Sequence, residues 1–488
     1  MSAKKIHRVP ILVALIAIVA AAIVFDNRES SSQAGAVRAA GAAAGASVPS
    51  ENSLSTSWYC AEGTSTPDGR ADETVLIASV ADTASEATVT VMPGGEAAPV
   101  SRTVRLDPRE EKRVRVADVL ATPEPAVVVE VVGGQAVVAH ELVANGDLAT
   151  EPCARGAASD WYFADGTTLK GAQQYLVLFD PFGDDAIVDV SLVTDDGVQE
   201  PDALQAISVP RRSRVTIPMS DLVPRQRSVA VHVHARTGRV VAERTQIFDG
   251  TASDGEVVRQ GIAVSLGALS PRREWYFPYG TTLEGAIGEI AIANFGALPT
   301  TVEVNVMLDG DQSLAPQQSD IPAHSVTTVD VGSLVPADQR YAVTVIARDA
   351  EGDTGPVVAE MLASWPSSSS SPGVAAALGS TRLAERWVIA LPAGDVEGII
   401  TVVNPGTAPL TATLLVYDAG DTTGPPSAPE RAIEAGRFAL FDLVDVGAGG
   451  DHVLVVTSDR PVAVGATFTG PGGADITPAI PDFLGGGG

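Results

Sequence analysis

The stretch WYFADGTT at residues 161–168 decides the fold, because the chain repeats it. Related stretches are WYCAEGT from Trp58, WYFPYGTT from Trp275 and a weaker version, WVIALPAGD, from Trp387. The four tryptophans follow one another at steps of 103, 114 and 112 residues. A repeat of this length corresponds to one small domain, and a chain of 488 residues is long enough for about four of them. The sequence therefore predicts a tandem array of four related units rather than one large enzyme domain.

The same order of strand signals follows each tryptophan. An apolar run enters a turn at Asp82, Asp180, Asn294 or Asn404 and leaves as a second run with alternating apolar residues, which is typical of a hairpin. A closing hairpin then ends each unit, as in VVVEVVGGQAVVAHE of the first and SVAVHVHARTGRVVAER of the second. No long helical period interrupts the pattern. About seven short strands in roughly 100 residues predict an all-β fold of immunoglobulin-like sandwiches.

The N-terminus predicts a location outside a membrane. Lys4, Lys5 and Arg8 precede an uncharged run from Val9 to Phe25, which Asp26 closes. An uncleaved transmembrane anchor is the favoured interpretation, and a signal peptide cleaved near Ala20 and Ala22 is the alternative. In both cases the rest of the chain faces outward.

Composition and repeat register together divide the chain into seven parts. The predicted parts are a cytoplasmic stub and transmembrane anchor (1–26), a disordered Ala/Gly/Ser linker (27–53), four units (54–154, 155–268, 269–380 and 381–484) and a disordered glycine tail (485–488).

Both cysteines of the chain, Cys60 and Cys153, lie in the first unit. Outside the membrane they are expected to form a disulfide. The repeat register aligns each cysteine with residues of the next two units: Cys60 with Phe163 and Phe277, and Cys153 with Gly267 and Gly379. We therefore predict that Phe163 covers Gly267 and that Phe277 covers Gly379, just as the first cysteine meets the second.

The motifs resemble those of a known group of proteins. WYFADGTT, the stretch VPRRSRVTIPMSDLVP and the hairpin SVAVHVHARTGRVVAER are similar to the WYFAEG-type repeats of actinobacterial cell-envelope proteins. With its single N-terminal anchor, the chain resembles an actinobacterial membrane-anchored family of unknown function over about residues 54–484. The fourth unit departs from the pattern and lacks the GTT. The resemblance implies an envelope location and β-sandwich repeats, and it offers no catalytic residues.

A search for catalytic or metal-binding motifs gives few candidates. The histidines form no HExxH or Cys/His zinc spacing, and the chain contains no GxSxG elbow or phosphate loop. His232 and His234 point to one face of a strand, where a solvated surface is the simpler interpretation and a metal site the other. Asp349 to Asp353 resembles part of a calcium loop but stands where the other units have plain turns. The sequence therefore predicts no catalytic residue, no metal and no cofactor.

Two groups of residues are candidates for an interaction surface. The repeated threonines could present hydroxyl groups to a glycan, or they could simply suit a strand that kinks after its glycine. A group of arginines in the second unit could meet an anionic wall polymer or an acidic partner, although their alternation with apolar residues makes a solvated strand face the default interpretation. The candidate residues are Thr167, Thr168, Thr281, Thr282, Arg211, Arg212, Arg214, Arg225 and Arg227.

These observations favour a non-enzymatic protein of the cell envelope. A net charge of −28 disfavours binding to nucleic acid or to anionic lipid headgroups. The expected location is the plasma membrane, with a single pass and extracellular C-terminal units. The expected function is a structural or interaction scaffold for a wall polysaccharide or another envelope protein. The alternative is a cryptic glycan-processing hydrolase that uses loop carboxylates, which would need a convergent polar pocket in one unit.

Overall fold

The computed structural model describes residues 45–50, 52–94, 97–252, 255–310, 312–348, 355–394, 397–420, 422, 427–450 and 452–483. These residues form an all-β protein with several sheets and only single turns of helix. The predicted anchor, most of the predicted linker, the segment from 349 to 353 and the glycine tail lie outside the described residues. Among the described residues, none belongs to a helix long and apolar enough to cross a membrane.

Each of the four units has two sheets. In the first unit, one sheet has the order β1 (Ser55–Cys60), β6 (Ala126–Val132), β3 (Ser85–Met92), β4 (Val100–Leu106), and the other has the order β5 (Glu111–Arg115), β2 (Asp72–Ser79), β7 (Ala136–Ala144), β8 (Asp147–Pro152). In the second unit, the first sheet has the order β9 (Asp160–Phe163), β15 (Val229–Thr237), β11 (Ala186–Thr194), β12 (Gly197–Gln199), and the short strand β13 (Ile207–Val209) also pairs with β11. The second sheet has the order β14 (Ser213–Pro218), β10 (Ala172–Asp180), β16 (Val241–Asp249), β17 (Gln260–Leu266).

The third and fourth units follow the same order. The third has β18 (Glu274–Thr281), β23 (Arg340–Arg348), β20 (Thr300–Leu308), β21 (Gln317–Ile321) and β22 (Ser325–Asp330), β19 (Ile287–Asn294), β24 (Val358–Trp365), β25 (Gly373–Leu378). The fourth has β26 (Ala384–Ile389), β31 (His452–Gly470), β28 (Leu410–Asp418), β29 (Glu430–Ile433), with β33 (Ile480–Asp482) beside β26, and β30 (Arg437–Asp442), β27 (Glu397–Asn404), β31 again, β32 (Gly473–Pro478). The helical turns are η1 (Val116–Asp118), η2 (Asp202–Leu204), α2 (Met219–Leu222) and η3 (Leu283–Gly285).

The strand order differs from that of an immunoglobulin domain, and the two hairpins predicted for each unit are wrong, because β2 and β3, like β6 and β7, lie in opposite sheets. In an immunoglobulin domain, the sixth and seventh strands, F and G, lie beside each other in one sheet. Here β7 follows β6 in the chain but pairs with β2 in the opposite sheet, and β1 takes the place beside β6. The other three units make the same exchange. The units are therefore two-sheet sandwiches with an order of their own.

The repeated tryptophan anchors each sandwich from inside. Trp58, Trp161, Trp275 and Trp387 are at most 1% exposed. The indole N–H of Trp161 donates to the carbonyl of Val240, 2.7 Å away, and that of Trp275 donates to Val357, 2.9 Å away. Val240 lies just before β16 and Val357 just before β24, where the chain crosses from one sheet of the unit to the other. The tryptophan therefore fills the core and also fixes where the chain makes this crossing.

The structure confirms the predicted pairing of the first strand with the end of each unit. Cys60 and Cys153 form a disulfide, with Cα atoms 4.8 Å apart. A Cβ atom added to Gly267 would lie 2.9 Å from the ring of Phe163, and one added to Gly379 would lie 2.7 Å from the ring of Phe277. Each glycine therefore leaves the space that the aromatic ring fills, at the place where the first unit has its disulfide.

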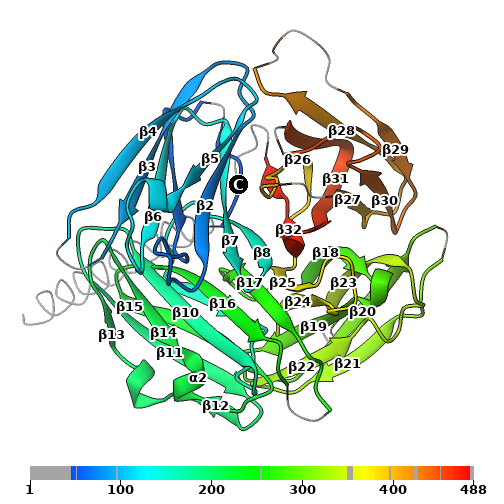
Figure 1. Ribbon diagram of the computed structural model, residues 1–488. Helices are drawn as coiled ribbons and strands as arrows, with labels where there is room; N and C mark the ends of the chain where they lie inside the picture. Colours follow the sequence, from blue (N-terminus) through cyan, green and yellow to red (C-terminus); the bar gives the residue numbers. More distant parts are fainter. Residues whose placement is uncertain are drawn as a thin grey trace, which may run out of the picture.

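The four units close into a ring, which the repeat alone did not predict (Figure 1). Strands β8, β17, β25 and β32 meet at its centre, and each of these strands contacts the next, with β32 returning to β8. The first unit therefore lies beside the fourth as well as the second. The array is closed rather than linear.

The two ends of the described chain also meet. Val48, which is 8% exposed, donates its backbone N–H to the carbonyl of Pro481, 2.9 Å away. The side chain of Arg155 donates to the carbonyl of Ser47, 2.9 Å away. Residues 45–50 thus pack against the first and fourth units, so the prediction of a disordered linker up to residue 53 is wrong for this part.

Candidate functional site

The segment after each repeated tryptophan docks on the next unit of the ring. The carboxylate of Glu243 in the second unit accepts the backbone N–H groups of Ala61 (3.0 Å) and Glu62 (2.7 Å) from the first unit. In the third unit, Glu360 accepts the N–H of Asp165, 3.1 Å away, from the second. Glu243 and Glu360 hold the same register position in β16 and β24. The repeated motif is therefore a connector between units.

The other two junctions use different side chains. At the register position of Glu360 the fourth unit has Gly465, and a Cβ there would lie 2.3 Å from the ring of Tyr279 in the third unit. An aromatic ring thus replaces the carboxylate. At the junction that closes the ring, Glu111 accepts the N–H of Leu391 (3.0 Å), and Glu141 accepts that of Ala393 (2.6 Å). Burial raises the pKa of Glu111 to about 7, although the hydrogen bond from the Leu391 N–H and the positive charge of Arg113 both lower it.

Two buried arginines complete the first two junctions. Arg244 forms a two-pronged ion pair with Glu360, with Nη–Oε distances of 2.7 and 3.1 Å. Arg214 donates to the carbonyls of Ala61, Gly63 and Pro125 and lies 3.4 Å from Glu62. Its side chain is 1% exposed. The prediction that Arg214 contributes to an interaction surface is therefore wrong, since its guanidinium group joins the first two units.

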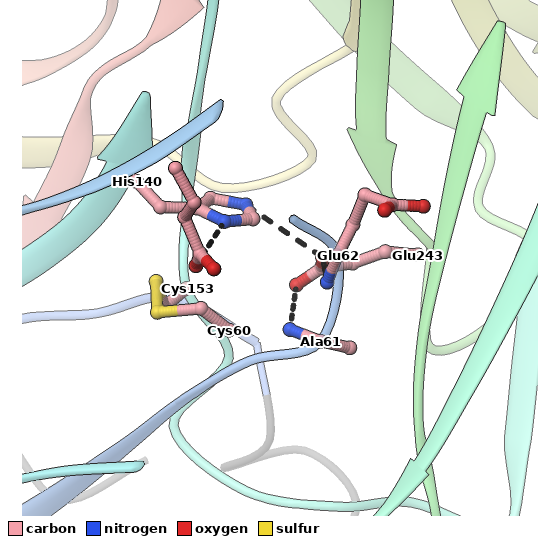
Figure 2. The surroundings of a disulfide bond; sticks show 7 residues. Cys60, Ala61, Glu62, His140, Cys153 and Glu243 are labelled. Atoms are coloured by element: carbon pink, nitrogen blue, oxygen red, sulfur yellow. Dashed lines mark hydrogen bonds and ion pairs between the residues drawn. A yellow bond between two sulfur atoms is a disulfide. The ribbon is translucent and has the colours of Figure 1, made fainter. Parts of the chain in front are cut away.

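A buried histidine lies beside the disulfide, and Figure 2 shows both together with Glu243. His140 is 3.3 Å from Glu73 and 3.6 Å from Glu243. Burial alone would lower the pKa of His140, but Glu243, Glu73 and Glu151 outweigh it and raise the pKa to about 9. The imidazolium is thus a countercharge for carboxylates between the first two units. Its ring nitrogen and the sulfurs of Cys60 and Cys153 lie within 4.8 Å of one another, but the sulfurs are bonded together.

Asp147 lies where all four units meet. Its carboxylate accepts backbone N–H groups from the other three units: Ile262 (3.2 Å), Val374 (2.8 Å) and Ala474 (3.1 Å). The corresponding residues of those units are glycines, and a Cβ on Gly261, Gly373 or Gly473 would lie 2.0 to 2.4 Å from the Asp147 carboxylate oxygens. Burial raises the pKa of Asp147 well above its usual value, although these N–H groups oppose the shift.

The candidate threonines mostly donate within their own units. Thr168 donates its hydroxyl to the carbonyl of Val223, and Thr282 donates to that of Pro336, 2.8 Å away. Thr167 donates to the carbonyl of Gln226, 3.1 Å away. These hydroxyl groups hold the end of the first strand against the segment that precedes β15 in the second unit and β23 in the third.

Thr281 also lines a cavity between the third and fourth units. The cavity has a volume of about 180 Å³. Its other polar lining residues include Glu284, Arg340, Glu397 and Asp442, and Trp365 forms part of its wall. Of the four candidate threonines, Thr281 is therefore the one placed at a hollow that a small polar ligand could enter.

The remaining candidate arginines do not form one patch. Arg211 and Arg212 are exposed in the turn before β14, whereas Arg225 is exposed after α2. The six residues of β14 separate the two places by roughly 20 Å, at about 3.3 Å per residue. Arg227 is exposed but pairs with Glu256, at an Nη1–Oε2 distance of 2.7 Å. Arg211 and Arg212 therefore offer the clearest basic surface of the set.

The structure brings Asp160 to the two histidines that the sequence noted. β9 pairs with β15 so that Asp160 stands opposite His234 and Tyr162 opposite His232. Oδ1 of Asp160 is 3.1 Å from Nε2 of His232 and 2.9 Å from Nδ1 of His234. Partial burial by itself would raise the pKa of Asp160, but hydrogen bonds from both histidines and Ser159 hold it below its usual value.

Sequence reasoning missed Asp160 and the junction carboxylates. Asp160 is 74 residues from His234 in the chain, and only the strand pairing brings them together. A signal existed for Asp147, because the repeat register aligns it with Gly261 and Gly373, each of which also lies 14 residues before the next repeated tryptophan. A single acidic residue in a position that is otherwise glycine indicates a special environment.

Comparisons with known proteins identify a family whose function is unknown. No curated protein matches the chain. Two of the solved structures that match are a protein described as Thermotoga maritima 1070 (14% identity, TM-score 0.20, covering 23% of this chain and 95% of that one) and the Anabaena sensory rhodopsin transducer (18% identity, TM-score 0.16, covering 18% and 94%). At these TM-scores neither likeness supports a conclusion. A family model described as a family of unknown function, DUF5719, matches residues 143–258 and 251–479, which is more than half of the chain. The chain therefore belongs to the DUF5719 family.

Proposed function

We propose that this protein is a non-enzymatic scaffold of the cell envelope, in which an N-terminal anchor holds a closed ring of four β-sandwiches outside the plasma membrane. The observation that carries the proposal is the use of the buried charged groups. Glu111, Glu141, Asp147, Glu243 and Glu360 all accept backbone N–H groups from another unit. Carboxylates that could suggest an active site thus hold the ring together.

Two further observations support the location. The Cys60–Cys153 disulfide is the kind of bond that persists in oxidising compartments outside the cytoplasm. The apolar run from Val9 to Phe25, after basic residues, is consistent with an anchor that leaves the following chain outside. The resemblance of the WYFADGTT motif to actinobacterial envelope repeats agrees with both.

The proposed partner is another envelope protein or a wall polysaccharide. An acidic protein would be repelled by most of the surface of this strongly acidic chain, so the exposed basic pair Arg211 and Arg212 is its favoured contact. For a polysaccharide, the favoured contact is the cavity lined by Thr281, Glu284 and Glu397, because hydroxyl and carboxylate groups there can bond to sugar hydroxyls.

Crosslinking of the full chain in its own cells tests the proposal, with mass spectrometry and sugar analysis of what is captured. We expect specific capture relative to a control that contains residues 1–53 alone. Arg211→Glu/Arg212→Glu should abolish capture of a protein partner, while Lys170→Glu/Arg239→Glu, which makes the same charge change on the same unit, should not. Glu284→Gln/Glu397→Gln should abolish capture of a polysaccharide.

Two outcomes would contradict the scaffold function. The first is capture no greater than with the control. The second is cleavage of wall glycan by the purified full chain that Glu284→Gln/Glu397→Gln removes, since this would establish the alternative, a glycan-processing hydrolase with loop carboxylates.

A further inference from the structure

Asp160, His232 and His234 form a cluster of metal-ligand type on the surface of the second unit. Their donor atoms lie within 4.8 Å of one another. Across the described part of the chain, the one other cluster of this type contains the disulfide sulfurs Cys60 and Cys153, which are bonded to each other. The side chains of Asp160, His232 and His234 are 31%, 25% and 51% exposed, so solvent ions reach them.

We propose that Asp160, His232 and His234 bind a divalent transition-metal ion of the zinc type. A tetrahedral zinc site has ligand bonds of about 2.0–2.2 Å, which places two ligand atoms about 3.4 Å apart. The two imidazole nitrogens are already 3.1 and 2.9 Å from Oδ1 of Asp160. Small side-chain movements therefore suffice to admit an ion in place of the two hydrogen bonds. Imidazole and carboxylate ligands suit zinc and its neighbours rather than calcium.

The surroundings of the cluster fix the ligands in the way that metal sites require. Ser159 donates to Oδ2 of Asp160, 2.7 Å away, and leaves Oδ1 directed at the histidines. The ring of Tyr162 stacks on His232, with centroids 4.2 Å apart and planes 5° from parallel. Phe295 of the third unit packs edge-on against Tyr162, with centroids 5.2 Å apart. A supporting hydrogen bond and packed rings of this kind orient metal ligands.

The groups that face the cluster from the neighbouring strand leave its donor atoms free for a metal. Asp189 and Ser191 of β11 stand opposite His234 and His232. The Asp189 carboxylate bonds to the side chain of Arg236 and to the N–H of Ala206. Asp189 is therefore held by Arg236 and Ala206 and does not compete for the metal position. With three protein ligands, a fourth coordination position remains open to water or to a group from a partner.

The second unit is the one in which this combination occurs. In the second unit, Asp160 pairs with His234 and Tyr162 with His232, and the other units have different pairs at these two register positions. The first unit has Ser57 with Glu130 and Tyr59 with Val128. The third has Glu274 with Ile346 and Tyr276 with Thr344, and the fourth has Arg386 with Thr457 and Val388 with Val455. The two-sheet fold thus forms without two histidines and a carboxylate there. A structural requirement of the repeat does not explain the cluster.

Calorimetric titration of Zn²⁺ into the full chain tests the proposal, with the protein purified without a histidine tag and treated with a chelator. We expect one saturable site per chain, and a Co²⁺ form with visible absorption bands of a low-symmetry site. Asp160→Asn and His234→Gln should each weaken Zn²⁺ binding by at least about tenfold and remove the Co²⁺ bands. His452→Gln is the matched control, because His452 forms a surface pair with one carboxylate, Asp418, 3.0 Å away.

Asp160→Asn keeps the test decisive if a histidine variant is less stable, because asparagine keeps an oxygen that accepts hydrogen bonds and removes the charge that a metal needs. Without metal it should unfold in the same cooperative transition as the parent chain, at a somewhat lower temperature, because Ser159 loses its acceptor and the histidines lose a charged one. Absence of saturable Zn²⁺ and Co²⁺ binding would overturn the proposal. Binding that Asp160→Asn and His234→Gln leave at full strength would overturn it as well.

Discussion

At the scale of single residues, Asp147 shows how one side chain can join four units. Its two carboxylate oxygens accept N–H groups from three separate strands, each from a different unit. A protein interior rarely leaves backbone N–H groups without acceptors, because an unpaired buried donor costs about 1–3 kcal/mol. Glycine at the matching positions of the other units leaves room for the one carboxylate. The contact therefore requires the first unit to differ from the other three at this one position.

We expect Asp147→Ala to lower the free energy of unfolding by about 3 kcal/mol or more, because three buried N–H groups lose their acceptor. Denaturant unfolding of the full chain measures this. Asp68→Ala, at an exposed aspartate, is the control and should change the free energy by less than about 0.5 kcal/mol. An equally small effect of Asp147→Ala would mean that the carboxylate does not hold the centre.

Gly373→Ala tests the same contact from the other side. The added Cβ would lie 2.4 Å from Oδ1 of Asp147 and 2.9 Å from the backbone nitrogen of Ala474. We expect a lower unfolding midpoint than that of the parent chain. In the Asp147→Gly background the same substitution should cost less, because the carboxylate clash is gone. Equal costs in both backgrounds would show that the clash with Asp147 is not the cause.

At the scale of elements, the first strand and the end of each unit form one interchangeable contact. The first unit joins them by Cys60 and Cys153, and the next two units by an aromatic ring over a glycine. The disulfide closes a loop of 93 residues, for which the chain-entropy model gives about 4–5 kcal/mol. The ring over glycine instead contributes buried apolar area.

We expect Cys60→Phe/Cys153→Gly to restore a packed contact without the disulfide. This variant should be more stable than Cys60→Ser/Cys153→Ser, which leaves two hydroxyl groups in a fully buried place. Thermal unfolding of both variants under identical oxidising conditions compares them. If the serine variant is the more stable, the first unit differs from the others in its packing at this contact.

The buried ion pair at the second junction should be far more sensitive to mutation than a surface pair. Glu360→Ala leaves Arg244 buried without its partner, and such a loss typically costs about 3–5 kcal/mol. The matched control is Glu303→Ala, which breaks the surface pair with Arg348 in the same unit, 2.9 Å apart, and should cost at most about 1 kcal/mol. Denaturant unfolding compares the two, and equal effects would contradict a role for Glu360 in the junction.

Element by element, the sequence predicts the local contacts better than the strand order. The tryptophan repeat, the disulfide and the Phe163–Gly267 contact follow from residue spacing, because they lie within a unit. The predicted hairpins are wrong, because the two runs of each, such as β10 and β11 or β15 and β16, lie in opposite sheets. The exchange of β1 and β7 between sheets leaves the alternation of apolar residues unchanged, so spacing alone does not reveal it. Arg214 stands between Ser213 and Val215 in a stretch that contains two further arginines, which is typical of a surface strand, and only the neighbouring unit makes it buried.

At the scale of the whole molecule, the ring concentrates buried acidic groups between its units. Burial raises the pKa of Asp475 to about 7 and outweighs its bonds from Thr477 and Thr150. The pKa of Glu111 is also raised to about 7, and that of His140 to about 9. Closure was outside the reach of sequence analysis, because a linear array and a ring have the same repeat.

We expect the ring to lose stability as the pH rises from about 5 to about 9. A carboxyl group whose pKa is raised in the folded state binds its proton more tightly when folded, so its ionisation favours unfolding above its unfolded pKa of about 4. A histidine with a raised pKa gives stability below about 6.5 that is lost as the pH passes its folded pKa, about 9. Both effects have the same sign in this window.

Thermal unfolding measured across that range checks the sign. Asp475→Asn keeps an acceptor for Thr150 and removes one titrating group, so its unfolding temperature should fall less steeply with pH than that of the parent chain. A parent chain that becomes more stable between pH 5 and pH 9 would contradict the assignment of raised pKa values to the junctions.

The position of Asp147 has a consequence for the order in which the protein is made. Its partners Ile262, Val374 and Ala474 follow it along the chain and leave the ribosome one after another. Until the last of them has been synthesised, the carboxylate stays hydrated and the centre of the ring stays open. A truncated chain therefore leaves β8, β17 and β25 at the centre without β32, so the final tenth of the chain decides whether synthesis yields a closed ring.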